Sequence, residues 1–390
     1  MAKARLDSWK SIAEYLKRSP RTVQRWHADL GLPIRRFGAG KGPVYANSDE
    51  LDAWLSGFTE DGGEDSGAGE LLAARKQRSS DLTVQANELW ELRTENNLPT
   101  IVALYRAAID QNPLDGPAFA GMANALILAA LTGAMRSSAA YSRAAEALMR
   151  AQRLGMETDD ARCAAAWLQM VYERKWKRAR DGFDMVLSRQ PGSAHALAGR
   201  ALLNIAEGRV PAALKCLDEA WKKNFLASVS GALAAWAQYL TGDFTAALET
   251  VSQSRYCGEF GPLSAAVEAL VLTQSGPVAV NLGRIEELAK TQPSNPVLKG
   301  ALGYAYAACD RAAMARDMLR DLATAAGDSQ YAAAIALIGL GEAQSAIARL
   351  DIAYAEGSLW SLGFRYDPIL QLLRDDPRFA SRLRRLGHTG

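Results

Sequence analysis

Residues 208–217 read Gly-Arg-Val-Pro-Ala-Ala-Leu-Lys-Cys-Leu, and residues 242–251, 34 positions later, read Gly-Asp-Phe-Thr-Ala-Ala-Leu-Glu-Thr-Val. Each stretch starts with a loop residue and continues as a helix. A small residue follows at a fixed offset (Ala213, Ala247), and a bulky apolar residue comes four positions later (Leu217, Val251). Small side chains at such positions let neighbouring helices approach closely. The pattern therefore predicts helical hairpins that stack along the chain.

The same spacing continues over roughly residues 81–358. The loop residues recur every 34 positions, with a last interval of 31: Arg174, Gly208, Gly242, Gly276, Asp310 and Gly341. The chain resembles tetratricopeptide (TPR) repeat proteins in this period and in its small residues. The resemblance implies a mainly α fold, with an α-solenoid of TPR-like hairpins over residues 81–390. Asp367-Pro368 and the acidic run at residues 375–376 predict capping helices with a charged outer face at its end.

Tetratricopeptide arrays form a curved trough lined by the first helix of each pair. In this frame the trough is mainly apolar and aromatic, and Asp328 and Tyr331 also map to it. The residues expected to form a partner-binding groove are Leu202, Ile205, Trp236, Tyr239, Leu270 and Tyr304. We expect a protein or peptide partner, with an apolar peptide, a lipid-like ligand or a second copy of the chain as occupants. The alternative is that these side chains only fill a tightly wound superhelix.

A different pattern occupies residues 1–57. Two short amphipathic helices are predicted on either side of a polar turn, and the second begins after Ser19, a good N-cap, with Pro20 at its first position. Val23, Trp26 and Leu30 share one side of this helix. The opposite side carries the residues that could reach bases in a DNA groove: Arg21, Gln24, Arg25 and Ala28.

Two predicted strands follow, around residues 34–37 and 44–46, and then a helix over residues 48–55. Residues 1–57 hold ten Lys or Arg and six Asp or Glu, whereas the whole chain has a net charge of only +2. The glycine-rich turn at residues 38–43 is no phosphate loop, because neither Ser or Thr nor a helix follows Lys41.

This block is similar to the winged helix-turn-helix domains of the MerR and phage-excisionase type, through its residues 9–16, 21–26, 31–34 and 50–55. The resemblance implies a double-stranded DNA partner, a reading helix at residues 21–28 and a wing at residues 34–45. The expected DNA-binding residues are Lys17, Arg18, Arg21, Thr22, Gln24, Arg25, Arg35, Arg36 and Lys41. One such domain reads few base pairs, so useful affinity implies a pair of copies, for example in a homodimer.

Two other functions remain open. The N-terminal module could dock a protein, which would make the chain a TPR interaction scaffold that does not bind DNA. A recombination or excision accessory factor is the third possibility, although the long repeat array argues against it. The favoured interpretation is a sequence-specific transcriptional regulator whose repeat array binds a partner or assembles the oligomer.

Several absences complete the expectations. The three His are scattered and the four Cys are 41 to 53 residues apart, so we expect no enzyme, no metal site and no cofactor. Residues 58–80 begin with a Gly-, Ser- and acid-rich stretch and are predicted to be a flexible linker. Neither a signal peptide nor a membrane span is expected, so both halves of the chain are predicted to lie in the cytoplasm.

Overall fold

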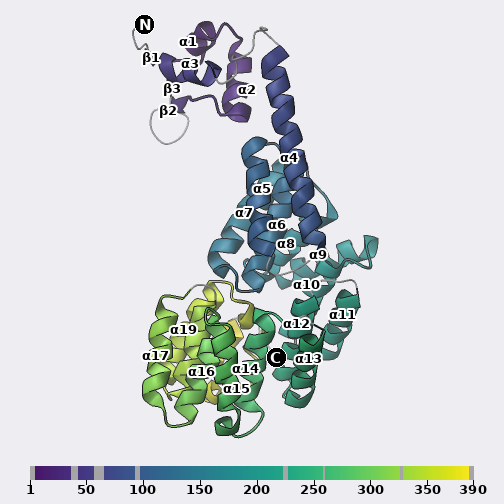
Figure 1. Ribbon diagram of the computed structural model, residues 1–390, viewed down its shortest axis with the longest axis vertical. Coiled ribbons are helices and arrows are strands. Elements are labelled where there is room, and N and C mark those ends of the chain that lie inside the picture. The colour runs from purple at the N-terminus through teal and green to yellow at the C-terminus, as the bar shows by residue number, and fades with distance from the viewer. Residues whose placement is uncertain are drawn as a thin grey trace. The chain divides into compact units, whose positions relative to one another are not determined.

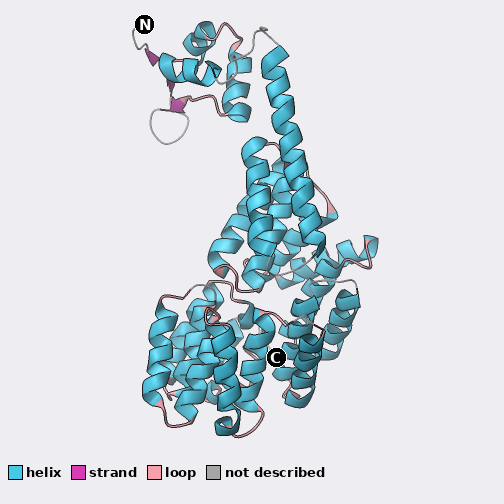
Figure 2. Cartoon of the chain, viewed as in Figure 1, coloured by secondary structure: helices cyan, strands magenta, loops and turns pink. Residues whose placement is uncertain are grey.

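The computed structural model describes residues 5–36, 43–56, 66–92, 97–222, 227–257, 260–325 and 328–385 (Figure 1). The chain divides into two compact units, one of residues 1–85 with 104–118 and the other of residues 86–103 with 119–390. Helices dominate both units, and the strands lie near the N-terminus (Figure 2).

The N-terminal domain is built from three helices and a small sheet. Its elements are β1 (Arg5–Leu6), α1 (Trp9–Tyr15), α2 (Pro20–Leu30), β2 (Arg35–Arg36), β3 (Val44–Asn47) and α3 (Ser48–Ser56). The three strands are antiparallel in the order β1-β3-β2, with Arg5 opposite Asn47 and Arg35 opposite Tyr45. The two helices, the following strand pair and the closing helix agree with the predicted order. Strand β1 is an addition that the sequence analysis does not predict.

Local signals place the ends of α2 where the sequence predicts them. The Ser19 hydroxyl accepts a hydrogen bond from the Thr22 N–H, Pro20 opens the helix, and Gly31 closes it with a φ of 68°. The domain then closes over its own apolar core. The buried residues of this core are Ile12, Ala13, Leu16, Val23, Leu32, Ile34, Val44, Ala46 and Leu51.

Helix α4 (Ser66–Leu92) corrects the linker prediction for residues 66–80. Residues 71–78 are Leu, Ala, Arg, Lys and Gln, which are strong helix formers, so the acidic, glycine-rich composition did not extend as far as predicted. Helix α5 (Leu98–Gln111) packs beside α4, where the Ser79 hydroxyl donates to the Ala108 carbonyl oxygen at 2.9 Å. The rest of the predicted linker, residues 58–65, lies outside the described residues.

The helices that follow form the repeat. Their bounds are α6 (Gly116–Leu131), α7 (Ser137–Arg153), α8 (Asp159–Val171), α9 (Trp176–Arg189), α10 (Ala194–Ala206), α11 (Val210–Lys222), α12 (Ala227–Leu240), α13 (Phe244–Tyr256), α14 (Pro262–Gln274), α15 (Val278–Thr291), α16 (Pro296–Ala308), α17 (Ala312–Ala323), α18 (Ser329–Gly339) and α19 (Ala343–Ala355). From α8 onward, consecutive helices pair as hairpins, and each hairpin packs on the next.

The turns inside these hairpins explain the sequence period. All six loop residues that recur along the sequence have positive φ: Arg174 (58°), Gly208 (73°), Gly242 (79°), Gly276 (146°), Asp310 (57°) and Gly341 (75°). A tight reversal between two helices needs a left-handed residue, which glycine adopts without strain. The repeat predicted from the sequence is therefore a repeat of backbone geometry.

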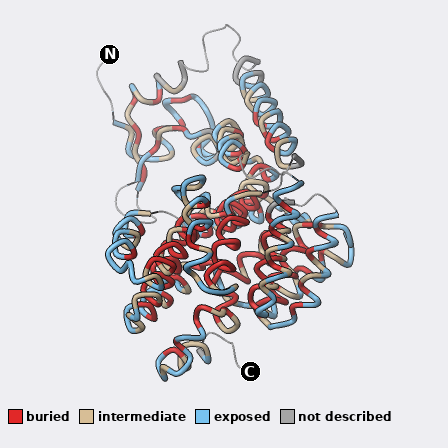
Figure 3. The backbone as a smooth tube through the Cα atoms, turned by 60° about the horizontal axis from the view of Figure 1, so that its bottom comes forward, coloured by how far each residue is buried: buried red, intermediate tan, exposed pale blue. Residues whose placement is uncertain are grey.

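The small residues lie where helices touch. Ala179, Ala213, Ala247, Ala315 and Ala346 are all fully buried at the start of the second helix of their pairs. Gly199 on α10 is tighter still, because a Cβ there would meet the Phe183 ring at 2.2 Å. Buried residues accordingly concentrate in the repeat helices, as Figure 3 shows.

Beyond α19 the chain forms two short 3-10 helices, η2 (Leu359–Leu362) and η3 (Ile369–Leu373), and then α20 (Pro377–Arg385). All of η2 is buried, as are Ile369, Leu370 and Leu373 of η3, and the apolar residues among them belong to the same core as the repeat helices. The predicted charged cap holds only for its later part, where Asp375 and Arg378 are exposed and Phe379 of α20 packs into the core, whereas Asp367 is buried. Trp360, Leu362, Phe364 and Ile369 lie in the core because this segment folds back over the repeat.

Candidate interaction surfaces

Helix α2 presents a polar side to solvent. Arg21, Gln24 and Arg25 are exposed, and Ala28 beside them is exposed too. On the opposite side Val23 is fully buried, and Trp26 packs against the core with its ring centroid 5.7 Å from that of Trp54. The division of α2 into a packed side and an open side is the one that the sequence predicts. The side chain of Leu30, predicted for the packed side, lies outside the described residues.

The two arginines on this open side are available for a ligand. Neither Arg21 nor Arg25 forms an ion pair with any residue that the structure describes. A guanidinium in that state keeps its full fork of N–H donors, which suits bidentate contact with a base edge or a phosphate. His27, further along the helix, is engaged inside the domain, since its Nδ1 lies 2.9 Å from the Leu32 carbonyl oxygen.

Some of the predicted DNA-binding residues around the start of α2 also make contacts within the domain. The Thr22 hydroxyl lies 2.8 Å from that of Ser19, so it belongs to the helix cap. Arg18 is exposed and its Cζ lies 5.9 Å from the centroid of the Trp26 ring. Lys17 is exposed at the turn between α1 and α2, with a φ of 49°. Thr22, Arg18 and Lys17 lie around the start of α2. Only Arg18 and Lys17 add positive charge beside the open side of this helix.

The strand candidates divide in the same way. Arg35 donates from Nη2 to Glu50 Oε1 at 2.9 Å, which ties it to α3. Arg36 is exposed on β2. Lys41 lies outside the described residues, as does most of the predicted wing turn. The structure therefore brings Arg21, Gln24 and Arg25 together on one helix and does not establish a continuous surface from α2 to the strands.

The predicted partner-binding groove is not open. Leu202, Ile205, Tyr239 and Leu270 are fully buried, Trp236 is 1% exposed, and only Tyr304 is partly exposed. The prediction that these residues form an accessible surface is therefore wrong for the first five. The segment containing η2 and η3 packs against α10 and against Trp236 and Tyr239 of α12, which explains the burial on those two helices.

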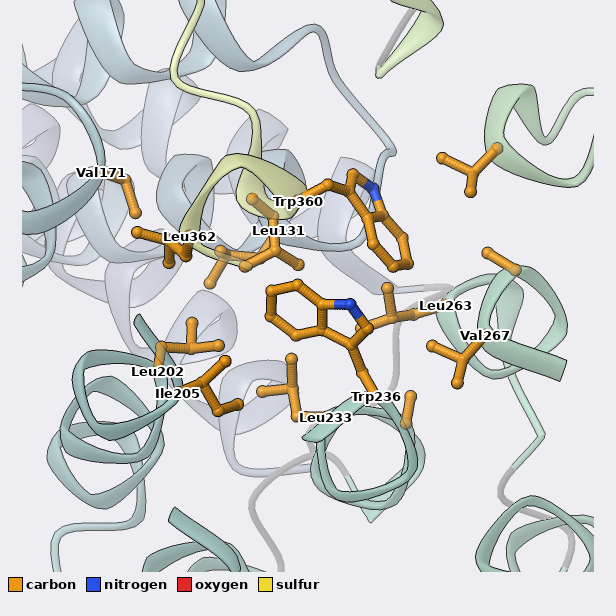
Figure 4. Packing of buried hydrophobic residues seen from close by; sticks show 14 of the residues in the cluster. Leu131, Val171, Leu202, Ile205, Leu233, Trp236, Leu263, Val267, Trp360 and Leu362 are labelled. Atoms are coloured by element: carbon orange, nitrogen blue, oxygen red, sulfur yellow. The ribbon is translucent and has the colours of Figure 1, made fainter. Parts of the chain in front are cut away.

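Figure 4 shows how the segment containing η2 and η3 fills the trough that was predicted to form the partner-binding groove. Trp236 of α12 lies among apolar side chains of α10 and α14, and Trp360 of η2 lies beside it. The two indole rings meet edge to face, with centroids 5.4 Å apart and planes at 78°. Trp360 also stacks on Tyr331 of α18, at 5.3 Å and 7°. A single indole thus joins α12 to α18, which are about a hundred residues apart in sequence.

A buried carboxylate fixes the segment a few residues later. Asp367 accepts hydrogen bonds from the Tyr239 hydroxyl at 2.8 Å and from the Tyr331 hydroxyl at 2.6 Å. Burial raises the pKa of Asp367, and the two tyrosine hydrogen bonds oppose that rise. The sequence predicts that Tyr239 and Tyr331 lie on a surface that binds a ligand. In the structure their hydroxyls donate instead to a carboxylate of the same chain.

Arg174 anchors the other end. From the turn between α8 and α9, its Nη2 donates to the Ser361 hydroxyl at 2.9 Å and to the Tyr354 carbonyl oxygen at 3.0 Å. Burial lowers the pKa of Arg174. A left-handed arginine is strained relative to glycine, and these contacts explain why an arginine occupies this turn.

The covering segment is what sequence reasoning missed. The signal that could have identified it is its density of large apolar side chains, with Trp360, Leu362, Phe364 and Ile369 within ten residues. Asp367-Pro368 and the acidic residues at 375–376 indicate a charged cap instead. Asp367, the first of those acids, is 2% exposed.

Among the described residues, His, Cys, Asp and Glu side chains form no group of three or more that could hold a metal ion. Within the same ranges, no helix combines the length and the apolar character that crossing a bilayer requires.

No protein-family model matches the chain, and no curated protein matches it. Among solved structures, a tetratricopeptide repeat protein from Parabacteroides merdae is 14% identical, with a TM-score of 0.42, covering 61% of this chain and 93% of that one. A chain of the APC/C hetero-tetramer Cut9-Hcn1 is 17% identical, with a TM-score of 0.48, covering 83% of this chain and 59% of that one. A chain of the human IFIT1 dimer with PPP-AAAA is 15% identical, with a TM-score of 0.40 and coverages of 76% and 70%. The tetratricopeptide-like fold of this chain stands on its own hairpins and turn spacing, and these similarities are similarities of fold.

Proposed function

We propose that the protein is an interaction scaffold built on a helical repeat, and that its N-terminal domain docks it on double-stranded DNA. The repeat supports the first part of the proposal, because stacked hairpins of this kind present long surfaces to protein partners. The second part depends on one observation. Arg21, Gln24 and Arg25 are exposed together on α2, while Val23 and Trp26 hold the other side of that helix in the core.

The chemistry of that side suits a major groove. Arg forms bidentate hydrogen bonds with guanine and Gln with adenine, and the small Ala28 leaves room for the helix to lie close to the bases. Lys17 and Arg18, exposed at the start of α2, would contact the phosphate backbone and set the orientation. Two copies binding adjacent half-sites would supply the affinity that a single small domain lacks.

A second candidate is that the same side of α2 docks an acidic protein surface. The charge of the described N-terminal domain favours it: eight Lys or Arg face six Asp or Glu over residues 5–36 and 43–56, a surplus of only two. Two of the arginines, Arg5 and Arg35, are held in ion pairs with Asp7 and Glu50. Binding to a protein surface requires less positive charge than binding to a DNA duplex. In this second candidate the scaffold would have protein partners alone.

The test is a titration of the full-length protein with a duplex selected from a randomised library. Fluorescence anisotropy is measured at several salt concentrations between 50 and 200 mM. DNA docking predicts binding that weakens steeply with salt, since each phosphate contact releases condensed counterions. Failure to select any duplex, together with no binding at 50 mM salt, would exclude DNA docking and leave the protein-docking candidate.

A further inference from the structure

A hollow of about 460 Å³ lies where α9, α10 and α11 meet. It is separate from the filled trough, because Arg200 and Leu202 are two positions apart on α10 and so point to nearly opposite sides of that helix. Its lining is strongly basic: Arg180 comes from α9, Arg200 from α10, Arg209 from the turn after α10, and Lys215 from α11. Four cations from three helices and a turn thus surround one open space.

Neighbouring carboxylates hold the guanidinium groups in place. Arg180 and Arg209 both form ion pairs with Glu207, and Arg200 Nε lies 2.7 Å from Asp184 Oδ1. A guanidinium has five N–H donors, so each of these pairs leaves donors unused. The carboxylates therefore orient the cations without exhausting them.

Arg200 carries the clearest sign of a missing ligand. Its Nη1 is buried and makes no hydrogen bond to any atom of the described residues. A buried donor left in this state destabilises the fold, and an anion toward which the Arg200 guanidinium turned would offset that cost.

The charges near the hollow leave one positive charge in excess. Against the four cations stand three carboxylates, Asp184, Glu207 and Glu219, and only Glu219 lines the hollow itself. Cys216 also lines it, and burial raises the pKa of its thiol, an effect that Arg200 partly opposes. The sulfur is therefore a neutral thiol at pH 7 and adds no negative charge.

We propose that this hollow binds the phosphate group of a phosphate monoester. Such a group carries close to two negative charges at neutral pH and has three acceptor oxygens, which suits several donors arriving from different helices. A carboxylate offers two oxygens in one plane and would leave part of the set unused. The volume lies within the range of small-molecule sites, which leaves space for the rest of the ligand.

Two sources would present this chemistry: a small phosphorylated metabolite, or a phosphorylated serine on a partner protein. Calorimetric titration of the full-length chain with ribose 5-phosphate and with the peptide acetyl-Gly-phosphoSer-Gly-amide distinguishes them. Binding of either probe, absent for ribose or for the unphosphorylated peptide, supports the site and identifies the source. Absence of binding for both probes at 10 mM overturns it.

Variants then test the location. Arg200→Gln and Lys215→Gln are expected to weaken binding of the productive probe at least fivefold, whereas Glu219→Gln, which removes the repelling carboxylate, tightens it at least twofold. Arg178→Gln is the matched control, because Arg178 is exposed on α9 and does not line the hollow. Lys215 is exposed, so its variant keeps the test valid if Arg200→Gln unfolds. Equal binding by the Lys215, Glu219 and Arg178 variants would refute the assignment.

Discussion

The open side of α2 and the inner face of the repeat were both predicted as binding surfaces, and they differ in what covers them. Arg21 and Arg25 are exposed on α2, whereas Trp236 and Tyr239 are buried beneath the chain's own η2 and η3. A helix face that carries charged side chains is predicted to be exposed, since burying unpaired guanidinium groups is costly. An apolar helix face does not show whether it is exposed, because the same side chains suit a ligand-binding surface or a buried core. Apolar patterning therefore predicts that a helix face is covered but not which part of the molecule or which ligand covers it.

Uncovering the trough should destabilise the fold more than any other single change. Trp360→Ala removes the indole that contacts both Trp236 and Tyr331, and is expected to lower the free energy of unfolding by about 3–5 kcal/mol. Chemical denaturation followed by circular dichroism measures it. Leu372→Ala is the control, because Leu372 lies in the same segment but is 67% exposed. Similar losses for the two variants would show that the segment is not held by its buried side chains.

A second prediction concerns Asp328, which lies at the start of α18. Burial raises the pKa of its carboxyl to about 6. Since the folded pKa exceeds the unfolded value of 3.8, the folded state favours the protonated carboxyl. Its stabilising contribution is complete below about pH 4 and is lost as the pH rises through 6. Asp328→Asn should therefore gain about 2–3 kcal/mol relative to the natural protein between pH 4 and pH 7.

Denaturation midpoints of both proteins across that range provide the measurement. Asp181→Asn, on the exposed side of α9, should follow the natural protein at every pH. A constant difference between Asp328→Asn and the natural protein would mean that the Asp328 carboxyl is not desolvated by the fold.

A smaller effect tests how closely the segment fits. A Cβ at Gly363 would lie 2.7 Å from Cζ2 of Trp236, so Gly363→Ala is expected to cost about 1–3 kcal/mol. Gly283→Ala on α15 meets nothing within 4 Å and should stabilise by about 0.5–1 kcal/mol. Thermal unfolding of the two variants gives opposite shifts if the trough is tightly filled, and shifts of the same sign would contradict this packing.

The last prediction concerns the open surface. Arg25→Ala is expected to lose about 1–3 kcal/mol of discrimination between the selected duplex and a mutated one. Arg35→Ala should lose less, because Arg35 is paired with Glu50. Anisotropy titrations with both duplexes compare them, and Arg106→Ala, at an exposed position on α5 outside the N-terminal domain, controls for net charge. Equal losses for all three variants would mean that α2 does not read bases.

Much of the fold followed from local chemistry. Ser19, Pro20 and Gly31 defined α2, and the recurring residues from Arg174 to Gly341 defined the hairpin turns, because each acts within a few residues of its own position. The filled trough did not follow, since the contact between Arg174 and Ser361 spans 187 residues. The basic hollow was missed for a similar reason: its cations come from separate helices and share no motif.

The return of η2 and η3 over the repeat has a consequence for biosynthesis. A simple solenoid can fold as it leaves the ribosome, because each hairpin needs only its neighbours. Here the nascent chain exposes Trp236 and Tyr331 until Trp360 has been translated, so chaperones have a window in which to bind an unsealed apolar row. Translation arrested between α19 and η2 would leave a chain with every hairpin formed and its longest-range contacts still missing.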